Sequence, residues 1–143
     1  MLVSHILRSK DSRVHWIEAH TSVADATAIL ARAGIGALLV MENGQKLVGI
    51  VSERDIVRAL ARGGAAELPV AIASLMTRDV VSCTPEITVD EVMDTMTQRR
   101  IRHLPVVASG RVIGVISIGD VVKALIDEAR READDLKRYI AAG

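Results

Sequence analysis

The chain has 143 residues, half of them hydrophobic, and its 18 basic residues balance 18 acidic ones. This length fits one domain, or two half-sized repeats that act as one, and the balanced charge offers no field that would attract nucleic acid or an anionic membrane. Only Trp16 and Tyr139 are aromatic, so the core is expected to be aliphatic and the stacking platforms of single-strand nucleic-acid binders are missing.

The chain begins with the pattern of a strand, a helix and a hairpin. A short strand is expected over residues 14–18, and Ser22 opens a helix whose apolar residues recur at helical spacing up to Gly34. Two apolar runs, 37–41 and 47–51, then flank an Asn-Gly turn, which is typical of a β-hairpin.

A second helix is predicted after Ser52, with Ile56, Val57 and Leu60 on its apolar face. Residues 62–69 contain paired glycines and a proline, which interrupt helices, and they are interpreted as a linker. The pattern of elements starts again beyond this linker.

The second half repeats the order of the first. A strand is expected over residues 80–83, a helix after Thr88, and a pair of strands over residues 103–107 and 111–116. A turn at Ser109 and Gly110 joins that pair. Each half therefore has the order strand, helix, strand, strand, helix.

The last helix is expected to begin near Ser117 and to run to about Ile140. Its later portion keeps an apolar stripe, formed by Leu125, Ile126, Ala129, Ala133, Leu136 and Ile140. The first half has no counterpart to this extension, so the stripe is expected to contact another surface, such as a second subunit.

The two halves are copies of one sequence. Residues 47–60 return as residues 112–125, a shift of 65 positions, whereas upstream positions match at a shift of 66 because the first turn has one extra residue. Two copies of about 60 residues each are small, so they are expected to share one core. We place the first repeat at 1–66, the second at 67–127 and a C-terminal helical extension at 128–143.

Each repeat carries Gly-x-x-Ser-x-x-Asp where a strand meets a helix, as Gly49, Ser52 and Asp55 and again as Gly114, Ser117 and Asp120. A helix start presents free N–H groups and a positive dipole end, which suit a phosphate, and its carboxylate can accept two hydrogen bonds from a ribose diol. The glycine would let a flat ligand approach the backbone. Ser-x-x-Asp is equally the pattern of a capping box, so the spacing alone leaves both interpretations open.

A basic cluster in the second repeat, Arg99–His103, leads into a predicted strand. Cations are favourable at a helix end in any case, which accounts for Arg99 and Arg100 without a ligand. Arg102 and His103 lie where the chain enters the sheet, and they could bind phosphate through charge-assisted hydrogen bonds. The comparable charge of the first repeat is Arg54, inside its Ser-x-x-Asp motif.

No other residue set indicates a reaction, so the chain is not expected to be an enzyme. The four histidines lack the spacing of zinc ligands, and Cys83 fits a small buried hydrophobe better than a nucleophile. The sequence has no Walker loop and no nucleophile elbow. It also shows no signal-peptide pattern and no apolar run of ~20 residues, so a cytoplasmic location is expected.

A tandem repeat with Gly-x-[Val/Ile]-Ser-x-x-Asp-[Ile/Val] closing each copy, and Arg-His-Leu-Pro-Val-Val inside one, resembles the cystathionine-β-synthase (CBS) domain pair, or Bateman module. The resemblance covers the chain up to its last helical turns. It implies an α/β (α+β) fold of two β-α-β-β-α repeats, packed sheet to sheet with pseudo-two-fold symmetry and leaving two clefts. Members of this family commonly bind AMP, ADP, ATP, NAD or S-adenosylmethionine there and act as regulatory sensors.

The resemblance also assigns roles to the motif residues. It implies that Asp55 and Asp120 each hold the ribose of one ligand, with Ser52 and Ser117 near the ribose or the phosphate. Each carboxylate would then belong to a separate adenosine site.

The symmetry of such modules implies that each ligand's phosphate reaches the opposite repeat. The Asp55 site would draw on Arg102 and His103, whereas the other site would have only Arg54. Adenine would rest on aliphatic residues around Val81. We therefore expect the Asp55 site to be better equipped for a phosphorylated nucleotide.

The sequence thus predicts a stand-alone CBS-domain protein that binds an adenine nucleotide, uses no catalytic cofactor and signals to an unknown regulated partner. It is expected to form a homodimer through its repeats and C-terminal helix, without nucleic-acid or membrane partners. The alternative is a structural protein-interaction module whose motifs are only caps. In that case Asp55→Ala would lower the free energy of unfolding by about 1 kcal/mol, and there would be no ligand binding to lose. An enzyme of unknown chemistry is disfavoured, because no nucleophile, metal set or acid/base pair is recognisable.

Overall fold

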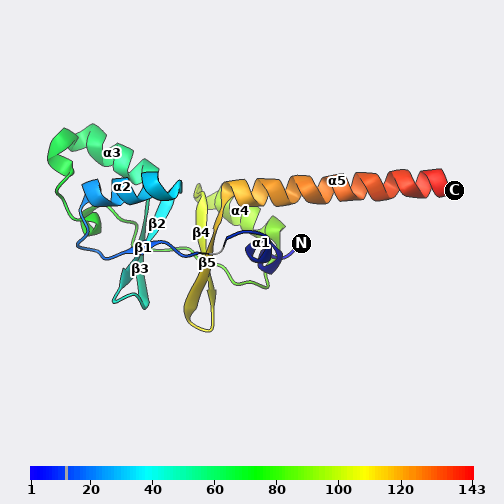
Figure 1. Ribbon diagram of the computed structural model, residues 1–143, viewed down its shortest axis with the longest axis horizontal. Helices are drawn as coiled ribbons and strands as arrows, with labels where there is room; N and C mark the ends of the chain where they lie inside the picture. The colour runs from blue at the N-terminus through cyan, green and yellow to red at the C-terminus, as the bar shows by residue number, and fades with distance from the viewer. Residues whose placement is uncertain (12) are drawn as a thin grey trace. The chain divides into compact units, whose positions relative to one another are not determined.

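The computed structural model describes residues 1–11 and 13–143. It divides into two compact units, which we call the first-repeat unit, Val14–Val81, and the second-repeat unit, which combines Met1–Arg13 with Ser82–Gly143. Each unit has its own small sheet with helices packed against it (Figure 1). The predicted mixture of helices and strands is confirmed.

The first-repeat unit has a three-stranded sheet in the order β1-β2-β3. β1 (Trp16–Ile17) runs parallel to β2 (Ala37–Glu42), which pairs antiparallel with β3 (Lys46–Ser52). The helix α2 (Val23–Ala33) precedes β2, α3 (Glu53–Gly63) follows β3, and two 3-10 turns, η1 (Gly64–Glu67) and η2 (Ile72–Ser74), complete the unit. β1 is shorter than predicted, and the predicted helices and hairpin lie where the sequence placed them. Part of the predicted linker, residues 62–69, is helical, because α3 runs to Gly63 and η1 follows it directly.

The second-repeat unit has a two-stranded sheet and three helices. After α4 (Val89–Arg99), β4 (His103–Ala108) pairs antiparallel with β5 (Arg111–Ser117), and α5 (Ile118–Ala142) follows. A helix from the start of the chain, α1 (Val3–Ser9), packs in the same unit. α5 extends far past the other elements of its unit, and its end near Ile140 is as predicted (Figure 1).

Both predicted hairpins form, and their turns explain the change in the repeat shift. The loop of the first hairpin has three residues, 43–45, whereas that of the second has two, 109–110. Gly44 and Gly110 adopt left-handed backbone conformations, with φ of 68° and 75°, as tight hairpin turns require. The extra residue of the first loop is therefore the predicted insertion.

The strand predicted over residues 80–83 does not form. Cys83 makes a single parallel bridge to β4, with its N–H donating to Pro105 O at 2.9 Å and its carbonyl accepting from Val107 N at 2.8 Å. In this parallel register the preceding step would need the N–H of residue 105 as donor, and the following step would need the N–H of residue 85. Both are prolines and have no N–H, so the ladder stops after one step and residues 80–82 do not pair.

The segment that precedes each repeat packs in the unit of the other repeat. In the first-repeat unit, Val23 N donates to Val70 O at 2.9 Å, and in the second-repeat unit, Val89 N donates to Met1 O at 2.9 Å. These are equivalent bonds, because Val23 and Val89 each begin the helix after their Ser or Thr cap. The compact units therefore do not follow the order of the sequence repeats.

The core of each unit is aliphatic, as predicted from the scarcity of aromatic residues. In the first-repeat unit, buried side chains of the sheet pack against α2, α3 and η2, and this core includes Leu38, Val40, Val51, Leu30, Ile56 and Ile72. In the second-repeat unit, the fully buried side chains include Leu104, Ile116 and Val92. Close packing of branched aliphatic side chains therefore stabilises both units.

One predicted core residue of α3 is not buried. Ile56 is 5% exposed, but Val57 is 64% exposed, and Ala59 is buried in its place. Successive residues of a helix point about 100° apart, so the burial of Ile56 turns its neighbour away from the sheet.

Candidate functional site

The two Ser-x-x-Asp motifs lie at equivalent points of the two units. Ser52 ends β3 and caps α3, and Ser117 ends β5 and caps α5. Asp55 and Asp120 are the third residues of these helices. Both motifs are therefore placed at helix starts, as predicted.

Each motif forms a complete capping box. Asp55 Oδ2 accepts hydrogen bonds from Ser52 N at 2.9 Å and from Ser52 Oγ at 3.1 Å, and Asp120 Oδ2 accepts from Ser117 N at 2.9 Å. The Asp N–H groups donate to the serine hydroxyls at 3.3 and 3.2 Å. In the described part of the chain these bonds use only Oδ2, so Oδ1 of each carboxylate can accept from a ligand.

The motif glycines serve internal packing rather than ligand approach. A Cβ at Gly49 would lie 2.6 Å from Met76 Sδ and 3.0 Å from Thr77 O, and a Cβ at Gly114 would lie 2.6 Å from Leu7 Cδ2. The space that we expected a flat ligand to use is thus filled by the segment that precedes the other repeat.

Arg102 and His103 lie beside the serine of their own unit. The strand register pairs His103 with Ser117, and Ile118 N donates to Arg102 O at 2.8 Å. Arg102 is exposed and His103 is half-buried. The structure therefore brings these two basic residues to the start of α5.

The same positions of the first-repeat unit carry no cation. Ala37 pairs with Ser52, and Gly36 O accepts from Glu53 N at 3.0 Å. The nearest basic residue in the motif is Arg54, the second residue of α3, which is exposed. The expected reach of phosphates from one repeat to the other remains a prediction.

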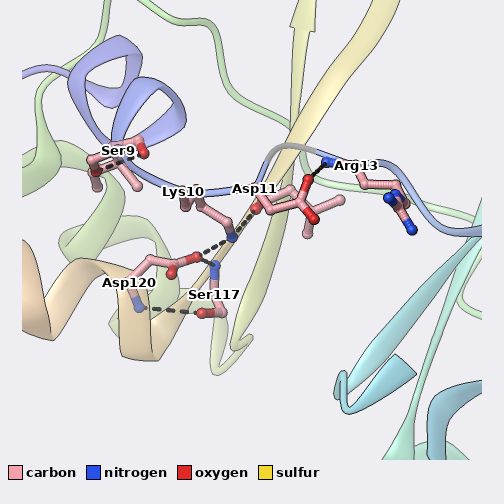
Figure 2. Close-up of polar contacts among 8 residues, drawn as sticks. Ser9, Lys10, Asp11, Arg13, Ser117 and Asp120 are labelled. Atoms are coloured by element: carbon pink, nitrogen blue, oxygen red, sulfur yellow. Dashed lines mark hydrogen bonds and ion pairs between the residues drawn. The ribbon is translucent and has the colours of Figure 1, made fainter. Parts of the chain in front are cut away.

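Lys10 is a site residue that the sequence analysis missed. Its Nζ donates to Asp120 Oδ2 at 2.6 Å and to Val115 O at 3.0 Å, as Figure 2 shows for the Asp120 contact. The side chains of Lys10 and Asp120 are 31% and 23% exposed, so the ion pair is partly shielded from water. Lys10 follows α1, which packs beside β5 and α5.

This ion pair makes the two motifs electrostatically different. Burial acting alone would raise the pKa of the Asp120 carboxyl, but the hydrogen bonds from Lys10 and Ser117 and the charge of Lys10 outweigh it and lower the pKa. Asp55 has no ion pair within the described residues. The Asp120 carboxylate is therefore charge-compensated before any ligand binds, whereas that of Asp55 is not.

Replacing Lys10 by methionine is expected to lower the free energy of unfolding by about 0.5–1 kcal/mol at pH 7, because the pair is only partly buried. The lowered pKa means that the pair stabilises the fold above the ordinary Asp value of 3.8 and that this stabilisation is lost as the pH falls through the folded-state pKa. Urea unfolding at pH 7 and at about pH 3 measures this difference.

The control for this variant is Arg8→Met, which removes an exposed cation of α1. Its small effect should not depend on pH over this range. If Lys10→Met cost the same stability at both pH values, the ionised Asp120 carboxylate would not be the partner that Lys10 stabilises.

Val81 and Cys83 lie outside the strands. Val81 is half-buried at the end of the first-repeat unit, and the structure does not place it on a strand that could support adenine. Cys83 is buried, and burial raises the pKa of its thiol to about 11. A thiol that stays protonated at neutral pH fits the predicted small hydrophobe and not a nucleophile.

The first-repeat unit has a cavity of about 330 Å³. Its lining includes Glu18, Glu42, Met76 and Arg78, of which Met76 lies beside the motif glycine Gly49 and Glu42 lies at the opposite end of the hairpin from Ser52. None of the predicted site residues lines it. In residues 1–11 and 13–143 no group of three potential metal ligands gathers, and no helix there is long and apolar enough to cross a membrane.

Comparison with known proteins connects this geometry to one family. The CBS domain family model matches residues 3–62 and 72–127. The CBS domain-containing protein CBSX3, mitochondrial, of Arabidopsis thaliana is 36% identical over 149 residues, which cover 99% of this chain and 72% of the relative. The structure of the CBS-domain containing protein ATU1752 from Agrobacterium tumefaciens has a TM-score of 0.85 at 40% identity, covering 87% of this chain and 98% of that one.

Two similar structures contain adenosine derivatives. The CBS domain pair of protein MJ0100, in complex with 5-methylthioadenosine and S-adenosyl-L-methionine, has a TM-score of 0.75 at 30% identity. CBSX2 in complex with AMP has a TM-score of 0.73 at 25% identity. In both comparisons the match covers 90% of this chain and 98% of the other.

Proposed function

The chain belongs to the CBS domain family, and from this premise we propose that it is a regulatory module that binds an adenine nucleotide at its Ser-x-x-Asp motifs. The observation that carries the proposal is the pair of motif carboxylates, each held at a helix start with Oδ1 left to accept from a ribose. Pairs of CBS domains are generally regulatory, and we assign this chain no reaction.

The ligand class follows from the adenosine derivatives bound by MJ0100 and CBSX2. In this proposal Asp55 and Asp120 accept from the ribose hydroxyls, and Ser52 and Ser117 lie near the ribose or the phosphate. The phosphate is bound by basic residues, namely Arg54, Arg102 and His103, and adenine packs near Val81. AMP, ADP, ATP and NAD satisfy all of these roles, whereas S-adenosylmethionine has no phosphate and satisfies only the roles of the ribose and adenine contacts.

Lys10 supports a difference between the two sites. Because its ammonium already compensates Asp120 at Oδ2, a ligand that donates to Oδ1 of that motif meets a carboxylate whose negative charge is shared with Lys10. Asp55 has no such competitor among the described residues. We therefore propose that the Asp55 site binds the phosphorylated nucleotide more tightly.

Signalling requires a partner, and we propose a homodimer that passes ligand occupancy to a regulated protein. A ligand can shift the equilibrium between two conformations of such a dimer only if it binds them with different affinities. The second candidate function is a structural interaction module without ligand. It is favoured by one observation, the completeness of both capping boxes, which gives the Ser and Asp residues a structural role.

A thermal-shift titration of nucleotide-free protein distinguishes the two candidates. AMP, ATP, NAD and S-adenosylmethionine would be tested separately, and one of them is expected to raise the Tm by roughly 5 °C or more, since a ligand at 100 times its Kd stabilises the fold by about 2.7 kcal/mol. If none of the four changed the Tm at millimolar concentration, the interaction module would replace the sensor.

A further inference from the structure

The C-terminal part of α5 has no covering surface in its own unit. Every residue from 129 to 143 is exposed, including Leu136, Tyr139 and Ile140, which are 60%, 78% and 68% exposed. A helical segment of about 15 residues without tertiary contacts is only marginally stable in water. Large exposed apolar side chains on such a segment indicate an interaction surface.

Six of the exposed apolar residues of α5 follow a heptad pattern. They are Val122, Ile126, Ala129, Ala133, Leu136 and Ile140, at intervals that alternate between four and three residues, and Tyr139 lies beside them at a g position. This spacing is that of the a and d positions of a coiled coil, with Ile126, Ala133 and Ile140 at a and the others at d. The buried residues of the same helix, Val121 and Ala124, lie on another face, which packs within the unit.

The heptad stripe continues onto an open, largely apolar surface at the start of α5. Gly119, Val122, Lys123, Ile126 and Arg130 are among the residues of that surface. Gly119 is the a position one heptad before Ile126. This surface and the stripe are therefore continuous, and we call them the α5 seam: residues 119, 122, 126, 129, 133, 136 and 140.

We propose that the α5 seam binds the same seam of a second copy of this chain, in parallel and in register, as a two-stranded coiled coil. Isoleucine at a and leucine at d favour two strands in this orientation. The two alanines, Ala129 and Ala133, let the helices approach closely at the middle of the seam. The proposal deepens the homodimer part of the proposed function and does not depend on the nucleotide.

The charges beside the seam select the parallel orientation. The e positions, Lys123, Arg130 and Lys137, are all basic, and Glu132 occupies a g position. In a parallel pair, a g residue faces the next e residue of the other helix, so Glu132 meets Lys137 of the second copy. An antiparallel pair would instead place e positions opposite each other, Arg130 facing Arg130 and Lys123 facing Lys137, which is repulsive.

This orientation places the two Asp120 motifs at the same end of the dimer. The seam begins at Gly119, next to Asp120, so the proposed nucleotide site and the dimer contact share one helix. A change in the direction of α5 at its start is thereby transmitted to the pairing of the helices.

Cysteine cross-linking of the full chain tests the pairing and its direction. Ile126→Cys and Leu136→Cys would be made in a Cys83→Ala background, and Arg131→Cys, at an outward f position, is the matched control. Disulfides form when Cα atoms lie within about 4.4–6.8 Å, which residues at equivalent a or d positions of a parallel in-register pair satisfy. Copper phenanthroline in air oxidises the thiols, and non-reducing gels show the products.

Each seam variant alone is expected to give a covalent dimer at least tenfold faster than Arg131→Cys. Cross-linking only when the two seam variants are mixed would show an antiparallel pair and overturn the proposal. A dimer in light scattering without rapid cross-linking of either variant would place the contact elsewhere and also overturn it. So would a monomer that binds vesicles of phosphatidylcholine and phosphatidylserine, because the seam would then face lipid. Nucleotide binding is measured separately by thermal shift, so its failure is distinguishable from all of these results.

Discussion

Replacing Asp55 by alanine is expected to weaken adenine-nucleotide binding by roughly 10- to 100-fold, because hydrogen bonds to a charged acceptor contribute about 1.5–3 kcal/mol each. The same change removes a cap, since Asp55 Oδ2 accepts from Ser52 N at 2.9 Å. A stability loss of about 1 kcal/mol is therefore expected in the ligand-free protein as well. Isothermal calorimetry with the nucleotide found by thermal shift measures the affinity, and urea unfolding measures the stability.

The matched control is Glu91→Ala, which removes the same kind of cap from a helix without a proposed ligand. In α4, Glu91 Oε2 accepts from Thr88 N at 3.3 Å, and Glu91 N donates to Thr88 Oγ1 at 3.1 Å. The two variants should lose similar stability, but only Asp55→Ala should lose affinity. Equal affinities for both variants would mean that Asp55 is a cap alone, and the interaction module would then be the better account of this motif.

The local elements of the fold could be predicted because their signals are local. Ser22, Ser52, Thr88 and Ser117 are helix caps in the structure, and the turn glycines lie where the apolar runs are interrupted. The internal repeat supported each assignment a second time. The predicted strand over residues 80–83 failed because Pro105 lacks the N–H that the step before Cys83 needs, and only the strand register identifies that donor.

The position of α1 and the role of Lys10 depend on contacts between distant parts of the chain. Lys10 and Asp120 are 110 positions apart, and no periodicity connects them. A weak signal existed, because Val3, Ile6 and Leu7 match Ile72, Leu75 and Met76 at a shift of 69. That alignment puts Asp79 at the place of Lys10. The charge difference between the two motifs therefore arises from segments that lie outside the obvious repeat.

The positions of the candidate site residues were therefore predictable, but their electrostatics were not. The motif spacing identifies Asp55 and Asp120 as equivalent residues. The structure separates them, because only Asp120 receives an ammonium group within the described residues. An ion pair of this kind can be found only when the segment that supplies the cation is placed in its unit.

Replacing Ile72 by alanine is expected to destabilise the chain by about 2–5 kcal/mol, as the truncation of a buried isoleucine usually does. Ile72 is 0% exposed and packs in the core of the first-repeat unit, and its N–H donates to Thr21 O at 2.8 Å. The effect would be large although the residue belongs to the sequence of the second repeat. Urea unfolding with the slope held in common measures the change.

Ile113→Ala is the control, because it makes the same chemical change on β5 at a side chain that is 39% exposed. It should cost less than about half as much, since part of the isoleucine surface is in water in both states. Equal costs would show that the segment around Ile72 adds no core to the first-repeat unit. A larger cost for Ile72→Ala would instead show that this segment is a structural part of the first-repeat unit. The segment places Met76 beside Gly49 and Ile72 in the core. The stability of the Asp55 motif therefore depends on residues that lie beyond the linker.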